Sequence, residues 1–347
     1  LVFFAILDAF AHTKIEGRRG VKLVLLAAMN GAVAGGTALL LSNVLQVGRR
    51  VDPAPFLAAM GGPSAAPPAT KGLDALVPAN LLEPFATNDA FTIAILAVLL
   101  GVALRHLPED ENRATFGRFA TASFQIVAKV LGWVIHLVPI AAFCVVAKVV
   151  GTSGFKALGG LAAFVGIVSL GLFIHVGFYY TTLIWGIARV PPWRFFPAVL
   201  DAVLTAFSTG SSLATLPVTL RTLDKMKVSP ESSRLAACVG TNLNNDGILL
   251  YEAVTALFIA QVIGRELDLG QQLWLVAASA GAAAGIAGIP DAGFITLTLV
   301  LASVGLPVEI APLLLPVDWL LGRLRASTNV LSDIVLARLL DVRRGDG

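Results

Sequence analysis

Long apolar segments, separated by short basic clusters, constrain this chain more than any other feature. Residues 21–45 contain no charged side chain after Lys22, and a helix of that length can cross a bilayer with tilt. Over the whole chain, 56% of the residues are hydrophobic, 14% are charged, and the mean hydropathy is +0.83. Because a soluble domain of 347 residues is not normally so apolar, the sequence predicts an all-α membrane protein that spans the bilayer several times.

The basic clusters predict how these segments are oriented. Clusters before residues 21–45, after residues 90–104, after residues 157–188 and in the C-terminal tail fit one topology, in which all four lie in the cytoplasm. The loop of residues 47–89, rich in Pro, Ala and Gly, then lies outside. We therefore expect a multi-pass protein of the plasma or inner membrane with a cytoplasmic C-terminus. The net charge of +3 suits such loops and not a nucleic-acid surface.

The cysteines and two of the histidines lie in apolar surroundings. Cys144 and Cys238 are predicted to be buried thiols and not a disulfide or a metal site. His136 and His175 lie inside apolar runs and have no metal-ligand spacing, which favours packed neutral side chains over a proton relay. Neither residue type indicates a redox or metal centre.

Two segments differ from ordinary membrane helices. Residues 205–217 (TAFSTGSSLATLP) and residues 282–293 (AAAGIAGIPDAG) place small residues and a proline between hydrophobic arms. Each is long enough to enter the membrane and return, which predicts two re-entrant helical hairpins that line a cavity. Paired interrupted segments in two halves of a chain are typical of a transporter's binding site. The alternative is close packing of Gly- and Ala-rich helices.

The C-terminal apolar region contains a stripe of polar residues. Asp318, Gly322, Arg325, Asn329 and Asp333 are spaced 4, 3, 4 and 4 residues apart, which places them on one face of an α-helix. A charged side chain at the bilayer centre costs about 3 kcal/mol by insertion scales, so the stripe needs an ion, a substrate or a buried pair as its partner. Arg325 can bind a carboxylate with two parallel hydrogen bonds, or it can pair with Asp318. Asn329 and Asp333 can share a cation or form hydrogen bonds to another helix.

Two further polar groups precede this stripe. Ser211 and Ser212 lie at the turn of the first hairpin, where hydroxyl and free backbone N–H groups can bind a carboxylate or simply cap a helix. The run TNLNNDGI, residues 241–248, interrupts an apolar helix. Asp246 and the carbonyls freed by the interruption offer hard oxygen ligands for Na⁺, although Asn-Asp-Gly is also common in loop turns.

In this order, the motifs SSLATLP, NNDG, GIAGIPDAG and VDWLLGRLRASTNVLSD resemble those of the dicarboxylate/amino acid:cation symporter family. The resemblance extends over essentially the whole chain. It implies a glutamate-transporter-like fold with eight membrane helices and two re-entrant hairpins, of which this chain lacks the first helix and most of the second. It also implies a homotrimer and an elevator mechanism, in which a transport domain crosses the bilayer and the second hairpin is the gate.

The resemblance also implies domain boundaries. The implied scaffold comprises residues 1–19, the end of the second membrane helix and a cytoplasmic loop, and residues 90–151, the trimerisation helices. The implied transport domain comprises the helix of residues 20–46 and residues 152–347. Within the latter segment, the expected parts are hairpin 1 (about 195–230), a broken helix (about 235–264), hairpin 2 (about 271–305) and the polar helix (about 308–340).

Carried over residue by residue, the resemblance implies roles for the polar groups. Ser212, aided by Ser211, would hold one substrate carboxylate, Arg325 would hold a second, and Asn329 would contact the substrate. The expected Na⁺ ligands, by side chain or backbone, are Gly240, Asn244, Asp246, Asn329 and Asp333, with Asn30 and Ile286 as further candidates. Gly288, in hairpin 2, is expected to line the substrate site and to supply a carbonyl to a third cation site. No other cofactor is implied, and H⁺ is the alternative coupling ion.

Several positions depart from the family pattern. Gly322 stands where amino-acid-transporting relatives have an Asp that binds the substrate amino group, and Asn245 stands where Met is typical. Asn30 and Gly31 replace Thr and Ser near one cation site. One hypothesis is that the substrate is a C4-dicarboxylate without an amino group. The other is that Asp291, at the gate tip, replaces the lost carboxylate and binds an amino group.

Three classes of function remain open from the sequence. The favoured class is a secondary active symporter that moves an anionic carboxylate with Na⁺ or H⁺. The second is an uncoupled anion channel on the same fold. The third is an intramembrane enzyme that uses Ser211 or Ser212 as a nucleophile, but no His or Lys lies near them in the sequence to act as a base. We therefore do not expect an enzyme.

Overall fold

The structure is a computed structural model that describes residues 17–59, 80–86, 90–108, 110–135, 157–284 and 292–342, with isolated positions between 3 and 151. In this part of the chain the secondary structure is helical, without a strand. The helices are α2 (Gly17–Leu45), α3 (Ala54–Ala59), α4 (Glu83–Ala86), α5 (Ala90–His106), α6 (Glu111–Ile135), α8 (Ala157–Ile174), α9 (Pro192–Thr209), α10 (Ser212–Lys225), α11 (Pro230–Arg234), α12 (Asp246–Val262), α13 (Leu269–Ala284), α14 (Ala292–Ser303) and α15 (Leu315–Asp341).

Shorter helical stretches join these helices. Three are π-helical, namely His175–Tyr180, Leu183–Ile187 and Leu235–Val239. The others are 3₁₀ turns at Val47–Arg50, Gly240–Asn242 and Val308–Leu314. π-Helical turns are rare and frequently occur at functional sites.

Two helical segments of the described residues are long and apolar enough to cross a membrane, by length and composition alone. They are Arg19–Arg50 and Gly159–Ile187. The other expected spans are shorter or more polar. α5 and α12 have 17 residues each, whereas a span needs about 20. α15 has 27 residues, but charged side chains interrupt its apolar sequence.

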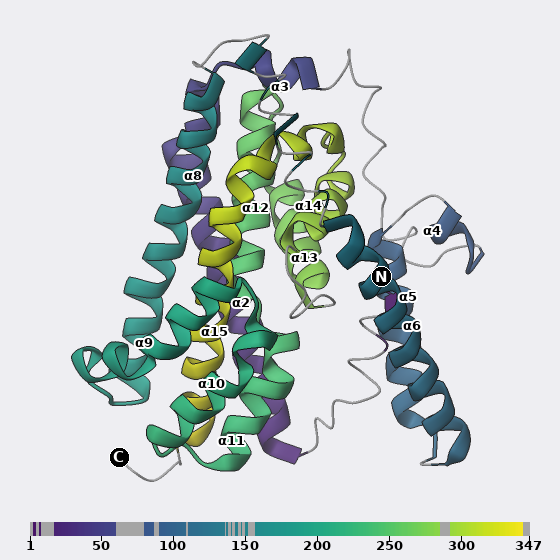
Figure 1. Ribbon diagram of the computed structural model, residues 1–347, viewed down its shortest axis with the longest axis vertical. Helices are drawn as coiled ribbons and strands as arrows, with labels where there is room; N and C mark the ends of the chain where they lie inside the picture. The colour runs from purple at the N-terminus through teal and green to yellow at the C-terminus, as the bar shows by residue number, and fades with distance from the viewer. Residues whose placement is uncertain are drawn as a thin grey trace.

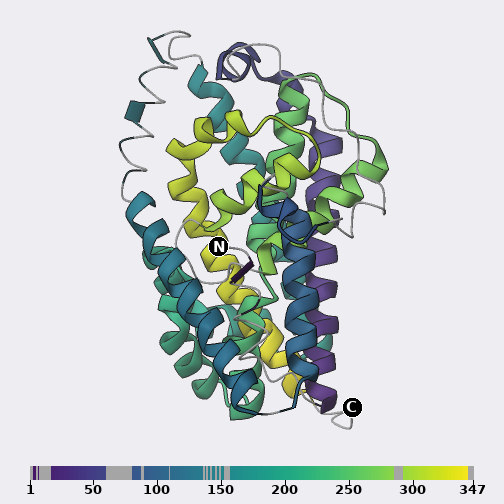
Figure 2. The ribbon, with the colours of Figure 1, turned by 90° about the vertical axis from the view of Figure 1, so that its right-hand side faces the viewer.

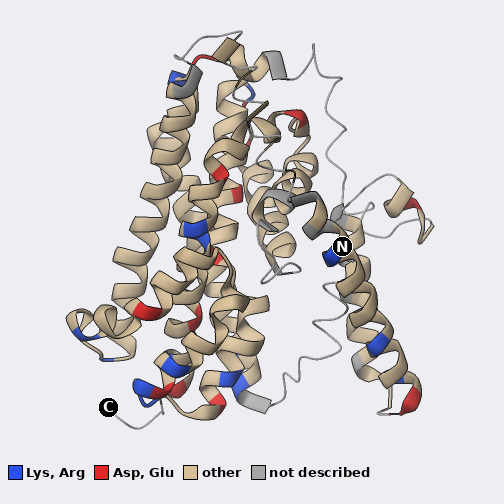
Figure 3. Cartoon of the chain, in the orientation of Figure 1, with Lys and Arg blue, Asp and Glu red and all other residues tan. Residues whose placement is uncertain are grey.

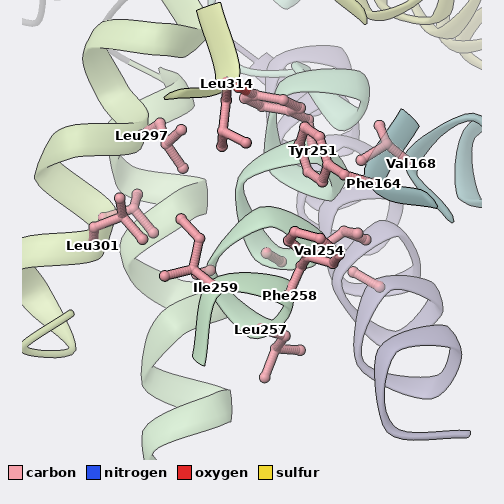
Figure 4. Close-up of a cluster of buried hydrophobic side chains, with 14 of the residues drawn as sticks. Phe164, Val168, Tyr251, Val254, Leu257, Phe258, Ile259, Leu297, Leu301 and Leu314 are labelled. Carbon is pink, nitrogen blue, oxygen red and sulfur yellow. The ribbon is translucent and has the colours of Figure 1, made fainter. Parts of the chain in front are cut away.

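α12 lies at the centre of the bundle, between α2, α8 and α15 (Figure 1). From Asp246 to Val262, every residue of α12 except Gln261 is buried, as expected for a helix that is apolar on all sides. Its side chains Tyr251, Val254 and Phe258 pack with Phe164 of α8 and with residues of α14, as Figure 4 shows. This first apolar cluster fixes the position of α12 against its neighbours.

A second apolar cluster lies around the C-terminal half of α15. It joins buried residues of α9, such as Val199 and Ala206, to Val330, Ile334 and Leu336 of α15. Charged residues gather mainly at the lower end of the bundle, near the C-terminus (Figure 3). α15 therefore passes from the first cluster to the second, and its polar residues lie between them.

Two pairs of consecutive helices pack against each other as hairpins. α9 and α10 are joined at Gly210, which has a positive φ of 64°, and α13 packs against α14. Pro192 at the first turn of α9 and Ser211 at the N-cap of α10 explain why these helices begin where they do. α5 contacts α13 and α14, whereas α6 extends away from the bundle (Figures 1 and 2).

The prediction of buried cysteines is wrong. Cys144 and Cys238 are both exposed. The prediction failed because apolar neighbours indicate burial only in a water-soluble protein. In a membrane protein, the outer face is also apolar, so an apolar sequence context does not distinguish a core position from a lipid-facing one.

Candidate functional site

The site is built around an interruption in the polypeptide before α12. The π-helical stretch and the 3₁₀ turn that follow α11 end at Asn242, and α12 begins at Asp246. The Gly240 carbonyl accepts hydrogen bonds from the backbone N–H groups of Leu243 at 2.7 Å and Asn244 at 2.8 Å. Non-helical backbone at membrane depth is tolerated only within protein or beside a cavity. Here Asn244, Asn245 and Asp246 are all buried.

Asp246 is the centre of a buried hydrogen-bond network. Its Oδ2 atom accepts hydrogen bonds from the Tyr180 hydroxyl at 2.7 Å and the Ser332 hydroxyl at 2.8 Å, and His175 Nε2 lies 3.3 Å away. His175 and Tyr180 begin and end the π-helical stretch, and all four side chains are buried. Two hydroxyl donors and the adjacent imidazole compensate a carboxylate that would be costly to bury alone.

Asn30 and Asn244 extend this network toward α2. The Asn30 amide nitrogen donates to Asn244 Oδ1 at 3.0 Å and to Ser332 Oγ at 3.3 Å, while Asn30 Oδ1 accepts from the Tyr179 hydroxyl at 2.7 Å. The Asn244 amide nitrogen donates to Ser332 Oγ at 2.7 Å and to Asp333 Oδ1 at 3.3 Å. The candidate ligands Asn30, Asn244, Asp246 and Asp333 therefore lie in one network, at the contact of α2, α12 and α15.

Asn329 lies one turn before this network on α15. Its Oδ1 atom accepts the backbone N–H of Gly247 at 2.8 Å, and its amide nitrogen donates to Asn245 Oδ1 at 3.1 Å. A β-carbon at position 247 would lie 2.7 Å from the Arg325 carbonyl oxygen. The close approach of α12 and α15 thus requires glycine at this position.

Arg325 is buried in an ion pair with Asp318. Nη1 and Nη2 of the guanidinium donate to the two carboxylate oxygens at 2.7 and 3.2 Å. The guanidinium also lies over the Tyr251 ring, 3.9 Å from its centroid, which is a cation–π contact. Gly293 of α14 faces it from another side, because a β-carbon there would lie 3.2 Å from Nε and 3.3 Å from Nη2. The buried-pair alternative for Arg325 is thus the arrangement that the structure contains.

Ser211 and Ser212 lie at the N-terminus of α10. Ser211 is the N-cap, and its hydroxyl accepts the backbone N–H of Ala214 at 3.2 Å. Both serines are buried, and α10 packs against α15. The capping role that the sequence left open is therefore present, and the N–H groups of the first turn other than that of Ala214 point out of the helix end.

Glu252 is one of the residues that the sequence analysis overlooked. Its side chain is completely buried on α12, next to Tyr251, and Thr296 and Ser279 face it. Neither carboxylate oxygen accepts a hydrogen bond of ordinary length from the described residues. The signal was visible in LLYEAVTALFIAQ, where Glu252 is the single ionisable acid in an apolar run.

Some predicted site residues are not brought together. The backbone of Gly240 adjoins the network, but its carbonyl already accepts two hydrogen bonds. Ile286, Gly288 and Asp291 lie outside the described residues. In the described part of the chain no group of three His, Cys, Asp or Glu residues could hold a metal ion. The donor set is instead carboxylate, amide and hydroxyl oxygen, which are hard ligands of the type suited to an alkali cation.

The family model and the similar curated proteins indicate the same family of membrane transporters. Residues 1–342 match the model of the sodium:dicarboxylate symporter family. The chain is 35% identical over 265 residues to excitatory amino acid transporter 1 of Ambystoma tigrinum, which covers 74% of this chain and 48% of the relative. It is 38% identical over 256 residues to excitatory amino acid transporter 4 of Rattus norvegicus, with 73% and 45% covered. The chain thus spans about half the length of the curated relatives that it matches.

Proposed function

Because the chain belongs to the sodium:dicarboxylate symporter family, whose members are membrane transporters and not enzymes, we propose that it is a secondary active symporter. Its substrate is an anionic carboxylate, and Na⁺ or H⁺ drives uptake. The observation that best supports this proposal is the buried guanidinium of Arg325. The Ser211 or Ser212 nucleophile hypothesis has no support from the family.

The geometry of Arg325 leaves room for a second carboxylate. A guanidinium has five N–H donors in a planar fork, and Asp318 engages one from each of Nη1 and Nη2. Gly293, which has no side chain, lies over the plane of the guanidinium. Among the described residues, the hydrogen bonds to Asp318 leave the edge formed by Nε and the second Nη2 hydrogen without an acceptor. A substrate carboxylate at this edge would form two parallel hydrogen bonds, the strongest arrangement that an Arg offers to an anion. A second substrate carboxylate would bind at Ser211 and Ser212.

The substrate class follows from the acids near Arg325. Gly322 supplies no carboxylate for an amino group, and Asp318 is already paired with Arg325. We therefore favour a C4-dicarboxylate over an acidic amino acid. The relatives are named excitatory amino acid transporters, so acidic amino acids remain the second candidate, with Asp291 as the residue that would bind the amino group.

The coupling cations would bind at the oxygens of the polar network. We propose Asn244, Asp246 and Asp333, with Asn329, as the Na⁺ ligands, because they combine two carboxylates with amide oxygens at the interruption before α12. The two helix pairs would be re-entrant hairpins, with α13 and α14 forming the gate. A homotrimer and an elevator movement complete the proposal. An uncoupled anion channel would instead give steady current without concentrative uptake.

The first experiment is uptake into proteoliposomes that contain the full-length protein, under an inward Na⁺ gradient. Labelled succinate and labelled L-aspartate are followed in parallel. We expect concentrative succinate uptake and little aspartate uptake, because no acid at position 322 recognises the amino group. Aspartate uptake would indicate that Asp291 binds the amino group, and the Asp291→Asn variant should then lose aspartate uptake. Absence of both activities in a folded protein would contradict the proposed function.

Glu252 provides a test of proton coupling. A buried carboxyl without a hydrogen-bond partner is least costly when it carries a proton, so Glu252 is suited to bind and release H⁺ during the cycle. We expect acid outside the vesicles to accelerate uptake at constant Na⁺, and Glu252→Gln to remove this response while keeping uptake itself. The matched control is Glu266→Gln, because Glu266 is exposed and pairs with Arg49. An unchanged response to the pH gradient in Glu252→Gln would exclude Glu252 as the proton carrier.

A further inference from the structure

A chain of side-chain amides connects α13 to α15. The Asn245 amide nitrogen donates to the Ala283 carbonyl at 2.9 Å, and Asn245 Oδ1 accepts from the Asn329 amide nitrogen at 3.1 Å. Asn329 Oδ1 in turn accepts the backbone N–H of Gly247 at 2.8 Å. Each of the two amides thus accepts a hydrogen bond at its oxygen and donates one from its nitrogen, so the three bonds run in one direction from Gly247 to Ala283. Hydrogen bonds arranged head to tail strengthen one another.

The position of Ala283 shows which helix this series of hydrogen bonds can hold in place. Ala283 lies in the last described turn of α13, and the hydrogen bond from Asn245 joins this turn to the segment before α12. Asn245 is buried and lies in the non-helical segment before α12, so its side chain ties that turn of α13 to the interruption before α12. Because Asn245 and Ala283 are buried, bulk solvent does not readily replace this bond.

We propose that Asn245 is a positioning residue that holds the end of α13 in register with Asn329. The proposal rests on the proposed function in one respect, namely that Asn329 contacts the substrate and that α13 is an arm of the gate. The Asn329 amide nitrogen has a second hydrogen, which a substrate oxygen can accept while the bond to Asn245 remains. Substrate binding would then fix the plane of the Asn329 amide, and through Asn245 it would fix the end of α13.

Movement of α13 can be measured with a single cysteine. Ser279 lies on α13 one turn before Ala283, is completely buried, and its hydroxyl has no partner among the described residues, so cysteine replaces it at little cost. The reporter protein is the full-length chain with Ser279→Cys, and with Cys144 and Cys238 replaced by serine. A maleimide reacts with the cysteine only when α13 moves away from its neighbours. The labelling rate therefore reports how firmly the end of α13 is held.

The test compares labelling rates without substrate. Leucine is close to asparagine in shape, so Asn245→Leu removes both hydrogen bonds and should raise the rate about tenfold, the equivalent of one buried hydrogen bond or a little more. The matched control is Asn43→Leu, which removes the 2.7 Å bond between Asn43 and Gln272 at the other end of α13. We expect that control to leave the rate unchanged. An equal rate in Asn245→Leu and the reporter protein would overturn the proposal.

A double-mutant cycle tests whether Asn245 acts together with Asn329. The side-chain hydrogen bonds that Asn329 makes are to Asn245 and Gly247, and neither is to α13. We expect Asn329→Leu to raise the labelling rate as well, and the double variant to label no faster than Asn245→Leu alone. Additive effects would show that the two residues act separately and would overturn the link. If Asn245→Leu does not elute as a monodisperse protein, Asn245→Ser, whose hydroxyl is shorter than the amide, replaces it in the same cycle.

This experiment is independent of the transport assay. The labelling rates without substrate decide whether the amide chain holds α13, whatever the protein transports. Succinate should slow labelling of the reporter protein and should not slow labelling of Asn245→Leu. If succinate is not taken up in the proteoliposome assay while the cycle is non-additive, the proposed substrate is wrong and the structural link is correct.

Discussion

Arg325→Leu will abolish carboxylate uptake and will also destabilise the folded protein. Uptake is lost because the substrate carboxylate no longer meets a buried charged donor. The lost binding free energy should lower transport at least about 100-fold. The loss of stability follows from Asp318, which is 3% exposed and would be left without its partner. Removing one member of a buried ion pair costs about 3–5 kcal/mol. Uptake and the thermal unfolding temperature of the purified protein measure the two effects.

The double variant Arg325→Leu/Asp318→Leu separates these effects. Replacing both partners of a buried pair with apolar residues is often neutral or stabilising, so we expect the unfolding temperature to recover while uptake stays absent. The matched control is Arg323→Leu, because Arg323 is two residues away, donates to the Trp319 carbonyl and lies 4.2 Å from the Trp319 ring. It should retain uptake. Uptake in the double variant would contradict the assignment of Arg325 to substrate binding.

The helix that contains Arg325 illustrates what the sequence could predict. The spacing of Asp318, Arg325, Asn329 and Asp333 predicts one helix face, and α15 places all four in the protein interior. The spacing did not identify their partners. Whether Arg325 meets Asp318 or a substrate depends on the side-chain torsions of one residue and on the position of α14, and neither leaves a periodic signal in the sequence.

The polar network shows a second limit of prediction. The run TNLNNDGI identified the interruption before α12 and its Asn and Asp residues, because polar residues inside an apolar segment are costly and therefore conspicuous. Tyr180 and Ser332 escaped notice because each is a common residue in a membrane helix. They become significant only because the π-helical stretch His175–Tyr180 and α15 bring their hydroxyl groups to Asp246.

The family comparison explains why the fold was easier to infer than the substrate. The order of the four motifs is a property of the whole chain, and the family model matches residues 1–342. In our proposal, substrate choice depends on single positions such as Gly322, at which the resemblance implies an Asp in amino-acid-transporting relatives. A single side chain can change which ligand binds without changing how the helices pack.

Asp246→Asn will sharply reduce uptake at subsaturating Na⁺ concentrations and leave the fold intact. An asparagine can keep its carbonyl oxygen at the position of Oδ2, where Tyr180, Ser332 and His175 would still find an acceptor. The substitution therefore removes the negative charge and preserves the hydrogen bonds. A charge in contact with a cation is worth several kcal/mol at the dielectric of a buried site, so we expect at least about a tenfold rise in the Na⁺ concentration that gives half-maximal uptake.

Asp246→Leu provides the contrast that identifies the cause. It removes the charge and the acceptor together, and it leaves the Tyr180 and Ser332 hydroxyls buried without this partner, each at a cost of about 1–3 kcal/mol. We expect a lower unfolding temperature in Asp246→Leu and not in Asp246→Asn. The matched control is Asp201→Asn, since Asp201 is exposed and pairs with Lys225 on the first hairpin. If Asp246→Asn retained the Na⁺ dependence of the unmodified protein, Asp246 would be a structural acceptor only, and the coupling cation would bind elsewhere.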